Sequence, residues 1–144
     1  ISLAGRPAGC ADVRMTASQI VALFAVLFHW ALPPGVPEAV EAALRAHGGD
    51  AATVLAVCTE ESAMGRRGRF LCGVRGGRAS TFEAQASFAA RAFPSRMGAR
   101  AMRRRLVLWV CGQNDVCGRE VGEDYARRVL GLRARIRRLS ALAE

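Results

Sequence analysis

Lysine is absent from this chain, and all twenty-one of its basic residues are arginine. The arginines are unevenly placed. Residues 1–61 carry three of them against six acidic residues, a net charge of −3, whereas residues 62–144 carry eighteen against six, a net charge of +12. A GC-rich genome explains arginine in place of lysine but not this excess of positive charge. Because guanidinium groups bind phosphate and stack on bases, we expect the second half to bind a polyanion.

Closely spaced cysteine pairs are also absent. The five cysteines show no C-x-x-C spacing, and the two histidines lie far from them in sequence. Structural zinc sites normally use closely spaced ligands, so we expect no metal site. Cys58, Cys72 and Cys111 fall in predicted strands, where a cysteine is usually a small buried hydrophobe. We therefore predict a reducing compartment, in which Cys58 and Cys72 lie opposite each other and can bond but stay unbonded.

Recognisable catalytic motifs are missing from the sequence. It contains no glycine-rich phosphate loop after a strand, no G-x-S-x-G motif and no paired carboxylates in an apolar setting. A lone cysteine such as Cys111 or Cys117 more often packs than reacts. We therefore expect a non-catalytic protein without a cofactor.

No hydrophobic run is long enough to cross a bilayer. The most apolar one, residues 20–32, has thirteen residues and includes His29, whereas a spanning helix needs about 20. We expect it to be a core helix. The chain starts with Ile1, so we expect that an upstream piece was removed, as an organelle-targeting peptide would be. The length of 144 residues suits one domain.

Capping residues, prolines and glycines mark out the expected elements. Thr16 with Gln19 and Ser80 with Glu83 have the spacing of capping boxes, and Pro94 bends the chain after Phe93. The expected order is a tail over 1–13, helices over 16–31 and 38–46, strands over 52–59 and 69–74, helices over 80–93 and 95–102, a strand over 106–111 and a helix over 120–142. The continuous apolar run 106–111 is typical of a central strand covered on both faces.

The bend at Pro94 gathers the densest positive charge. Five arginines lie within ten residues beside it: Arg96, Arg100, Arg103, Arg104 and Arg105. A helix that starts at Ser95 would add free amides and its dipole, which favour phosphate. Further RNA contacts are predicted for Arg66 and Arg67, in the turn between two strands, and for Arg133 and Arg137 on the last helix. We expect the outer half of that helix to become ordered only against a polyanion, because its arginines repel one another.

This order of elements resembles the type II KH arrangement, and the chain is similar to the ribosome-binding factor A family of small-subunit assembly factors. The residues that carry the resemblance are 95–105, which read Ser-Arg-Met-Gly-Ala-Arg-Ala-Met-Arg-Arg-Arg before the apolar strand, with the hairpin over 53–74 and the helix over 19–30. The chain departs from the family in having Ala86-Ser87-Phe88 where an Ala-x-Gly corner is usual, and in the insert over 33–49.

The resemblance implies an α+β, type II KH-like fold, with a three-stranded sheet packed by a bent helix and with added N-terminal and C-terminal helices. It divides the chain into an extended tail over 1–15, a KH-like domain over 16–112 and an Arg-rich C-terminal helix over 113–144. It also implies binding to immature small-subunit rRNA without catalysis.

Charge and resemblance together predict a non-catalytic rRNA-binding factor of small ribosomal subunit assembly, or an organellar ribosomal protein, in a mitochondrion or chloroplast. Its expected partners are small-subunit rRNA and ribosomal proteins, with no small-molecule substrate and no membrane. The alternative is a structural accessory subunit of an organellar membrane complex, with residues 20–32 packed on a neighbouring subunit.

Overall fold

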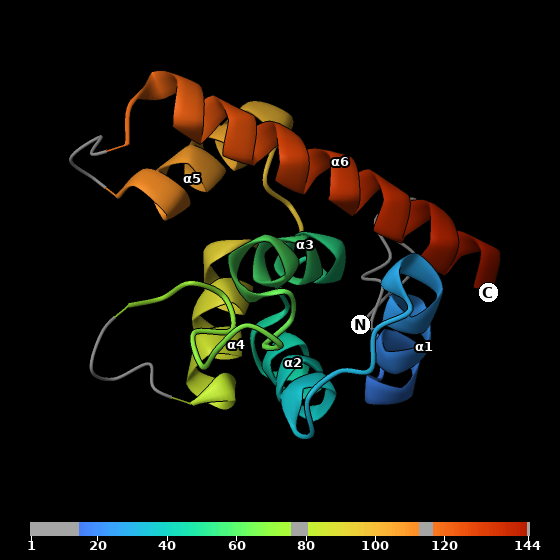
Figure 1. Ribbon diagram of the computed structural model, residues 1–144. Helices are drawn as coiled ribbons and strands as arrows, with labels where there is room; N and C mark the ends of the chain where they lie inside the picture. Colours follow the sequence, from blue (N-terminus) through green and yellow to red (C-terminus); the bar gives the residue numbers. More distant parts are fainter. Residues whose placement is uncertain (1–14, 76–80, 113–116, 144) are drawn as a thin grey trace, which may run out of the picture.

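The structure, a computed structural model, describes residues 15–75, 81–112 and 117–143 (Figure 1). These residues form α1 (Ala17–Phe28), α2 (Val36–His47), α3 (Ala51–Ser62), α4 (Phe82–Ala92), α5 (Ala99–Cys111) and α6 (Arg119–Ala143). The described part of the chain contains no strand, and its β pairing is limited to one isolated bridge between Gly49 and Pro94. The predicted α+β, KH-like fold with a three-stranded sheet is therefore wrong.

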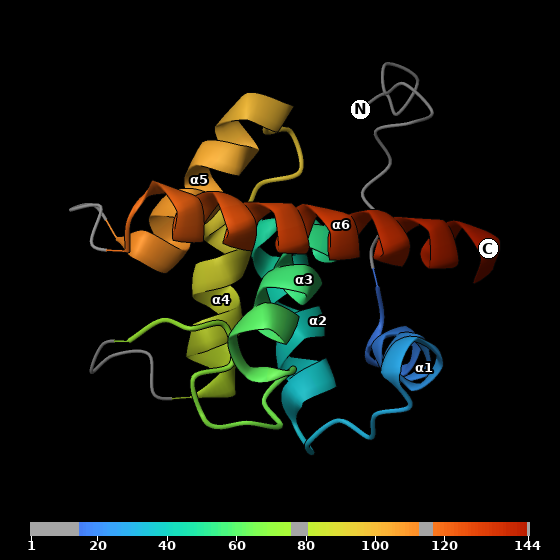
Figure 2. The same ribbon diagram turned by 45° about the horizontal axis from the view of Figure 1, so that its top comes forward.

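Helix α3 lies at the centre of the molecule. Helix α6 crosses over it, α5 packs beside the first half of α6, and α4 and α2 pack together on the other side of α3 (Figures 1 and 2). Helix α1 lies against α2 and the outer half of α6. The chain is thus organised around residues 51–62, which the sequence predicted to be a strand and a polar turn.

The helical state of α3 begins at its N-cap. The Asp50 carboxylate accepts a hydrogen bond from the Thr53 amide at 3.2 Å, which starts the helix. Every residue of 51–58 is buried. A short run that is apolar on all sides fits a buried strand or a buried helix equally well, and burial overrides the β propensity of its valines and threonines.

The other two predicted strands are also wrong. Residues 69–74 form an irregular loop, and residues 106–111 are the second half of α5. Met102 and Leu106, one helical turn apart, are buried, whereas Leu108 is 44% exposed. A strand with Leu106 and Leu108 on one buried face is incompatible with that pattern.

Local signals were more reliable than the strand predictions. Both hydrogen bonds of the Thr16–Gln19 capping box are present, at 2.9 and 3.2 Å. Pro37 lies in the first turn of α2, and α4 ends just before the Pro94 bend. The second helix begins at Ala99 rather than Ser95. The N-cap of α4 is Thr81, whose hydroxyl accepts the Ala84 amide at 3.1 Å, and not the predicted Ser80. The tail over 1–13 lies outside the described residues.

Helix α6 packs on the core along most of its length. Its buried residues include Tyr125, Val129, Leu132 and Ile136, and Ile136 is only 1% exposed. The predicted helix over 120–142 is confirmed. None of the helices in the described ranges is both long enough and apolar enough to span a membrane.

Candidate active site

The last turn of α3 carries two glutamates, Glu60 and Glu61. The helix stops directly after them because Ala63 and Met64 adopt left-handed backbone angles, with φ of 51° and 58°, and their amides donate back to helix carbonyls at 2.8 and 3.1 Å. The C-terminal end of a helix carries partial negative charge, which disfavours a carboxylate there. Glu61 therefore occupies a position that costs electrostatic free energy when its carboxyl is ionised.

The Glu61 carboxyl lies against the hydroxyl of Tyr125, which α6 brings across the end of α3. Burial raises the pKa of Glu61 above its ordinary value, and this outweighs the Tyr125 hydroxyl and the nearby Arg75, which lower it. Burial also raises the pKa of the Tyr125 phenol, and the Glu61 charge adds to that shift. The phenol therefore stays protonated and can donate a hydrogen bond.

The Tyr125 hydroxyl is buried beside the Glu61 carboxyl. Tyr125 is 3% exposed, and its hydroxyl makes no hydrogen bond of normal geometry to any described residue, although Glu61 is beside it. A buried polar group without a partner costs free energy and calls for a specific explanation. The buried phenol faces the Glu61 carboxyl and is placed to donate to that carboxylate when it is ionised.

Gly73 forms another wall of this site. A β-carbon at residue 73 would overlap the Glu61 carboxyl, and the φ of Gly73 is 81°, in the left-handed region. The backbone conformation therefore favours glycine, and any other residue would also displace the Glu61 side chain. The carboxyl lies between the Gly73 backbone and the Tyr125 phenol.

The loop around Gly73 is held by side chains rather than by a sheet. The oxygen of the buried Gln85 side chain accepts the amides of Cys72 and Val74 at 3.2 and 3.0 Å, and its nitrogen donates to the Val74 carbonyl at 2.6 Å. The indole N–H of Trp109 donates to the Cys72 carbonyl at 2.9 Å. Helices α4 and α5 therefore both fix the backbone on either side of Gly73.

A disulfide between Cys58 and Cys72 ties the same loop to α3. The prediction that these two cysteines stay unbonded is wrong. A second disulfide, between Cys111 and Cys117, joins the end of α5 to the start of α6. Disulfides persist in oxidising compartments, so the expectation of a reducing one loses its basis. Cys10 lies outside the described residues.

Ser62, directly after Glu61, anchors the start of the loop. Its buried hydroxyl donates to the Leu71 carbonyl at 2.6 Å and accepts the Gly65 amide at 2.8 Å. The residue directly before Ser62 is Glu61, which carries the carboxyl of the site. The geometry around Glu61 is therefore fixed on both sides of the loop, as a preorganised site requires.

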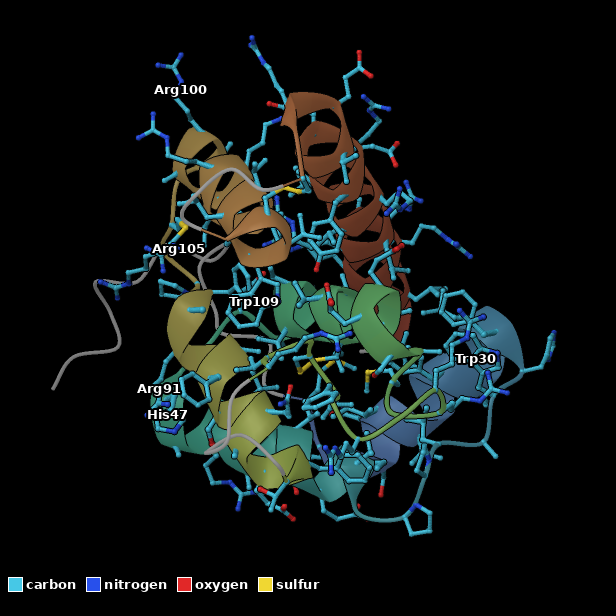
Figure 3. All side chains as sticks on the ribbon, turned by 60° about the vertical axis from the view of Figure 1, so that its left-hand side comes forward. Trp30, His47, Arg91, Arg100, Arg105 and Trp109 are labelled. Carbon is cyan, nitrogen blue, oxygen red and sulfur yellow. A yellow bond between two sulfur atoms is a disulfide. The ribbon has the colours of Figure 1, made fainter. Side chains whose placement is uncertain are left out.

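The nine arginines predicted to bind RNA lie on three separate parts of the described surface. The group beside the Pro94 bend is exposed and comprises Arg96, Arg100, Arg103, Arg104 and Arg105 (Figure 3). Arg105 donates to the carbonyl of Ala92 at 2.9 Å, and Arg103 pairs with Glu123 at 2.9 Å. These two arginines therefore hold helices together in addition to carrying surface charge.

The other predicted arginines are Arg66 and Arg67, in the turn after α3, and Arg133 and Arg137, on α6. The Arg66 guanidinium lies 4.4 Å from the centre of the Trp30 ring, and Arg137 pairs with Asp50 at 3.2 Å. The structure thus does not bring the nine arginines together into one site.

Sequence reasoning missed Glu61, Tyr125, Gly73 and Gln85. One signal was available: two glutamates directly follow a wholly apolar segment, and the only tyrosine of the chain lies on the last helix. Their proximity depends on tertiary packing and could not be read from spacing. Within the described residues, no group of three or more histidine, cysteine or acidic side chains is placed to hold a metal ion.

Comparisons of the chain with protein-family models, with curated proteins and with solved structures found no match.

Proposed function

We propose that the protein is an enzyme in which Glu61 is the general acid for cleavage of a glycosidic bond in a polysaccharide. The observation that carries the proposal is the partly buried Glu61 carboxyl, which lies between the Gly73 backbone and the buried Tyr125 hydroxyl. The sequence alone predicted a non-catalytic protein, because it does not reveal that Glu61 is partly buried.

The chemistry of acetals supports this choice of reaction. A glycosidic bond breaks when a carboxylic acid protonates the leaving-group oxygen, and the acid must keep its proton at the working pH. Burial raises the pKa of Glu61 in that direction. The Tyr125 hydroxyl, as a donor, can stabilise the Glu61 carboxylate after proton transfer.

A group on the substrate itself can take the role of the second carboxylate. Glu60, the nearest acid in sequence, is engaged with Arg128 at 3.2 Å. Some glycoside hydrolases use a group on the sugar itself as nucleophile, so one protein carboxyl is sufficient. The two disulfides favour a protein that works outside reducing compartments, where structural and capsular polysaccharides are found.

The test compares Glu61→Gln with Glu60→Gln in the full chain. Release of reducing ends or of soluble fragments is measured on a panel of peptidoglycan, chitin, hyaluronan and alginate. Removal of a general acid should lower the rate on the cleaved polysaccharide by roughly 10²–10⁴-fold. Glu60→Gln makes the same change in size and charge at the neighbouring residue but should retain most of the activity. No cleavage of any polysaccharide by the unaltered chain, or equal loss in both variants, would reject the proposal.

The predicted rRNA binding stays a prediction and is a second candidate function. The exposure of Arg96, Arg100 and Arg104 favours it, but the KH-like sheet on which its geometry was based is wrong. An RNA-binding role predicts affinity that falls steeply with salt because phosphate contacts release counterions. Salt-independent or absent binding to small-subunit rRNA would remove this candidate. Mitochondrial or chloroplast localisation likewise stays a prediction.

A further inference from the structure

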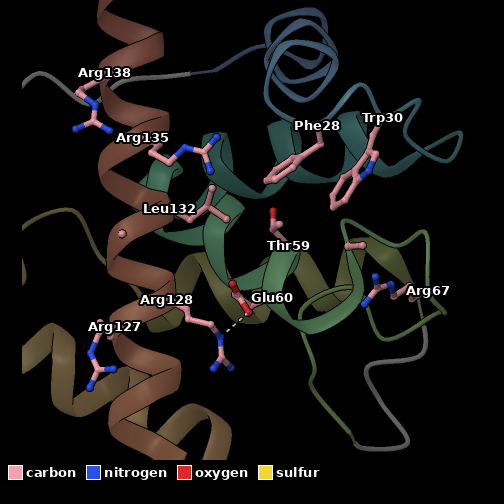
Figure 4. Close-up of a pocket in the computed structure, with 12 residues that line it drawn as sticks. Phe28, Trp30, Thr59, Glu60, Arg67, Arg127, Arg128, Leu132, Arg135 and Arg138 are labelled. Atoms are coloured by element: carbon pink, nitrogen blue, oxygen red, sulfur yellow. Dashed lines mark hydrogen bonds and ion pairs between the residues drawn. The ribbon is translucent and has the colours of Figure 1, made fainter.

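A hollow of about 630 Å³ lies where α1, α3 and α6 meet (Figure 4). Its volume is typical of ligand sites, which span roughly 300–1,000 Å³. Thr59 and Glu60, in the last turn of α3, line part of it, and Glu60 directly precedes Glu61 in sequence. Glu61 itself is not among the residues that line the hollow.

One wall of the hollow is aromatic. His29 has a φ of 57° and ends α1, so the chain turns back and Trp30 stacks on Phe28 with the ring centroids 4.3 Å apart. Both rings are half-buried and pack against the core. The Arg66 guanidinium, 4.4 Å from the Trp30 ring centre, further restrains the indole. Phe28 and Arg66 both lie over the indole ring, so a sugar in the hollow would meet the exposed edges of the two rings.

The remaining wall is positively charged. Its charged residues are five arginines and one glutamate, a net charge of +4: Arg67, Arg127, Arg128, Arg135, Arg138 and Glu60. Arg127 and Arg128 pair with Asp124, and Arg128 also pairs with Glu60.

Three of these arginines, Arg67, Arg135 and Arg138, have no acidic partner among the residues that the structure describes. Arg135 reaches from α6 toward Phe28, 5.9 Å from that ring centre, while Arg67 lies on the side of Trp30 (Figure 4). Like charges held around one depression repel, and an anion between them relieves this repulsion. The occupant that fits is therefore an anionic group joined to a ring.

We propose that this hollow binds a carboxylate-bearing sugar of the polysaccharide that Glu61 cleaves. The sugar lies along the exposed edges of Trp30 and Phe28, and separate carboxylates of the polymer pair with Arg135 and with Arg67. The inference rests on the proposed function for the nature of the polymer, but binding is read separately from cleavage.

The experiment uses the full chain with Glu61→Gln, so that no ligand is consumed. Affinity is measured by calorimetry at about 0.15 M salt, where long-range surface charge is screened beyond about 8 Å. The probes are hyaluronan oligosaccharides, in which every second sugar carries a carboxylate, and uncharged chito-oligosaccharides of the same length. A single-stranded RNA of matched charge is the third probe. Arg135→Gln and Arg67→Gln are compared with Arg100→Gln, an exposed arginine on α5 far from Trp30 (Figure 3).

Hyaluronan should bind at least roughly tenfold more tightly than the neutral sugar, and Arg135→Gln and Arg67→Gln should each weaken it about tenfold, since a contact to a charged group contributes about 1.4 kcal/mol or more. Arg100→Gln should change it less than about twofold. Equal affinity for both sugars, an equal loss in Arg100→Gln, or tighter RNA binding that Arg135→Gln abolishes would each overturn the proposal.

The two proposals fail in different ways. If the unaltered chain cleaves no polysaccharide while the hollow variants still lose hyaluronan, the catalytic role of Glu61 is wrong and the ligand class of the hollow stands. If the chain cleaves a polysaccharide and the hollow variants bind hyaluronan normally, only the assignment of the hollow is wrong.

Discussion

The backbone of Gly73 is in direct contact with the carboxyl of Glu61, and no other amino acid fits at residue 73 without displacing one of the two. The contact joins the end of α3 to a loop whose own position depends on Gln85, Trp109 and the disulfide to Cys58. The position of the carboxyl thus depends on α3 and, through the loop around Gly73, on α4 and α5.

Gly73→Ala tests the importance of this contact. A left-handed φ costs a non-glycine residue about 1–2 kcal/mol, and the overlap with Glu61 adds to that cost. Gly48→Ala is the matched control, because Gly48 has a φ of 67° and open space around it. We expect Gly73→Ala to lower the free energy of unfolding more than Gly48→Ala does, as measured by urea denaturation, and to lose activity on the polysaccharide. Equal destabilisation by the two variants would show that the contact is unimportant.

A neutral residue at position 61 should stabilise the protein at high pH. Because burial raises the pKa of Glu61 above its ordinary 4.5, the folded state favours the protonated carboxyl. Below pH 4.5 the folded and unfolded states both hold the proton and nothing is lost. As the pH rises through the folded pKa, the protein must carry a charged, desolvated carboxylate and loses stability relative to Glu61→Gln.

The measurement compares melting temperatures of the unaltered chain and Glu61→Gln at pH 4 and pH 8. The advantage of the variant should be larger at pH 8, while Glu60→Gln should show no such gain because Glu60 is paired with Arg128. A difference that does not vary with pH would contradict the assignment of a partly buried carboxyl whose pKa is raised.

The Cys58–Cys72 disulfide should affect both stability and activity. It closes a segment with a sequence separation of 14, for which loss of the constraint on the unfolded chain costs about 3 kcal/mol. Cys58→Ala with Cys72→Ala should therefore lower the urea midpoint and also the activity, since Gly73 follows Cys72. The Cys111–Cys117 disulfide closes a shorter segment, with a separation of 6. Its removal by Cys111→Ala with Cys117→Ala should cost about 2 kcal/mol, with most activity retained. Unchanged activity in the double variant of Cys58 and Cys72 would show that this disulfide is not needed to form the site.

Local sequence signals predicted the ends of several helices correctly. The Thr16–Gln19 capping box, Pro37 in a first turn and the break at Pro94 depend only on nearby residues, and all are present. Such signals work because capping and proline effects are satisfied within a few residues. They do not decide whether an apolar segment is a helix or a strand.

Burial from several sides hid both the fold and the site. Residues 51–58 are buried on all sides by other helices, and a segment without periodicity fits a strand as well as a helix. The prediction of a strand there turned the hairpin and the KH-like sheet into expectations and placed Glu61 in a polar turn. The meeting of Glu61 with Tyr125, a residue 64 positions later, follows only from the packing of α6 on α3.

The outer half of α6 provides the last prediction. The sequence indicated that this half, rich in arginine, orders only against a polyanion, whereas the structure buries Ile136 and pairs Arg137 with Asp50. If Ile136 belongs to the core of the free protein, Ile136→Ala should cost about 2–5 kcal/mol, the range for removing a buried isoleucine side chain. Val121→Ala, on the same helix but 54% exposed, should cost far less. The variants are compared by urea denaturation without nucleic acid or polysaccharide. An Ile136→Ala cost as small as that of Val121→Ala would mean that the outer half of the helix is not docked in the free protein, and would restore the idea of an arm that orders on a ligand.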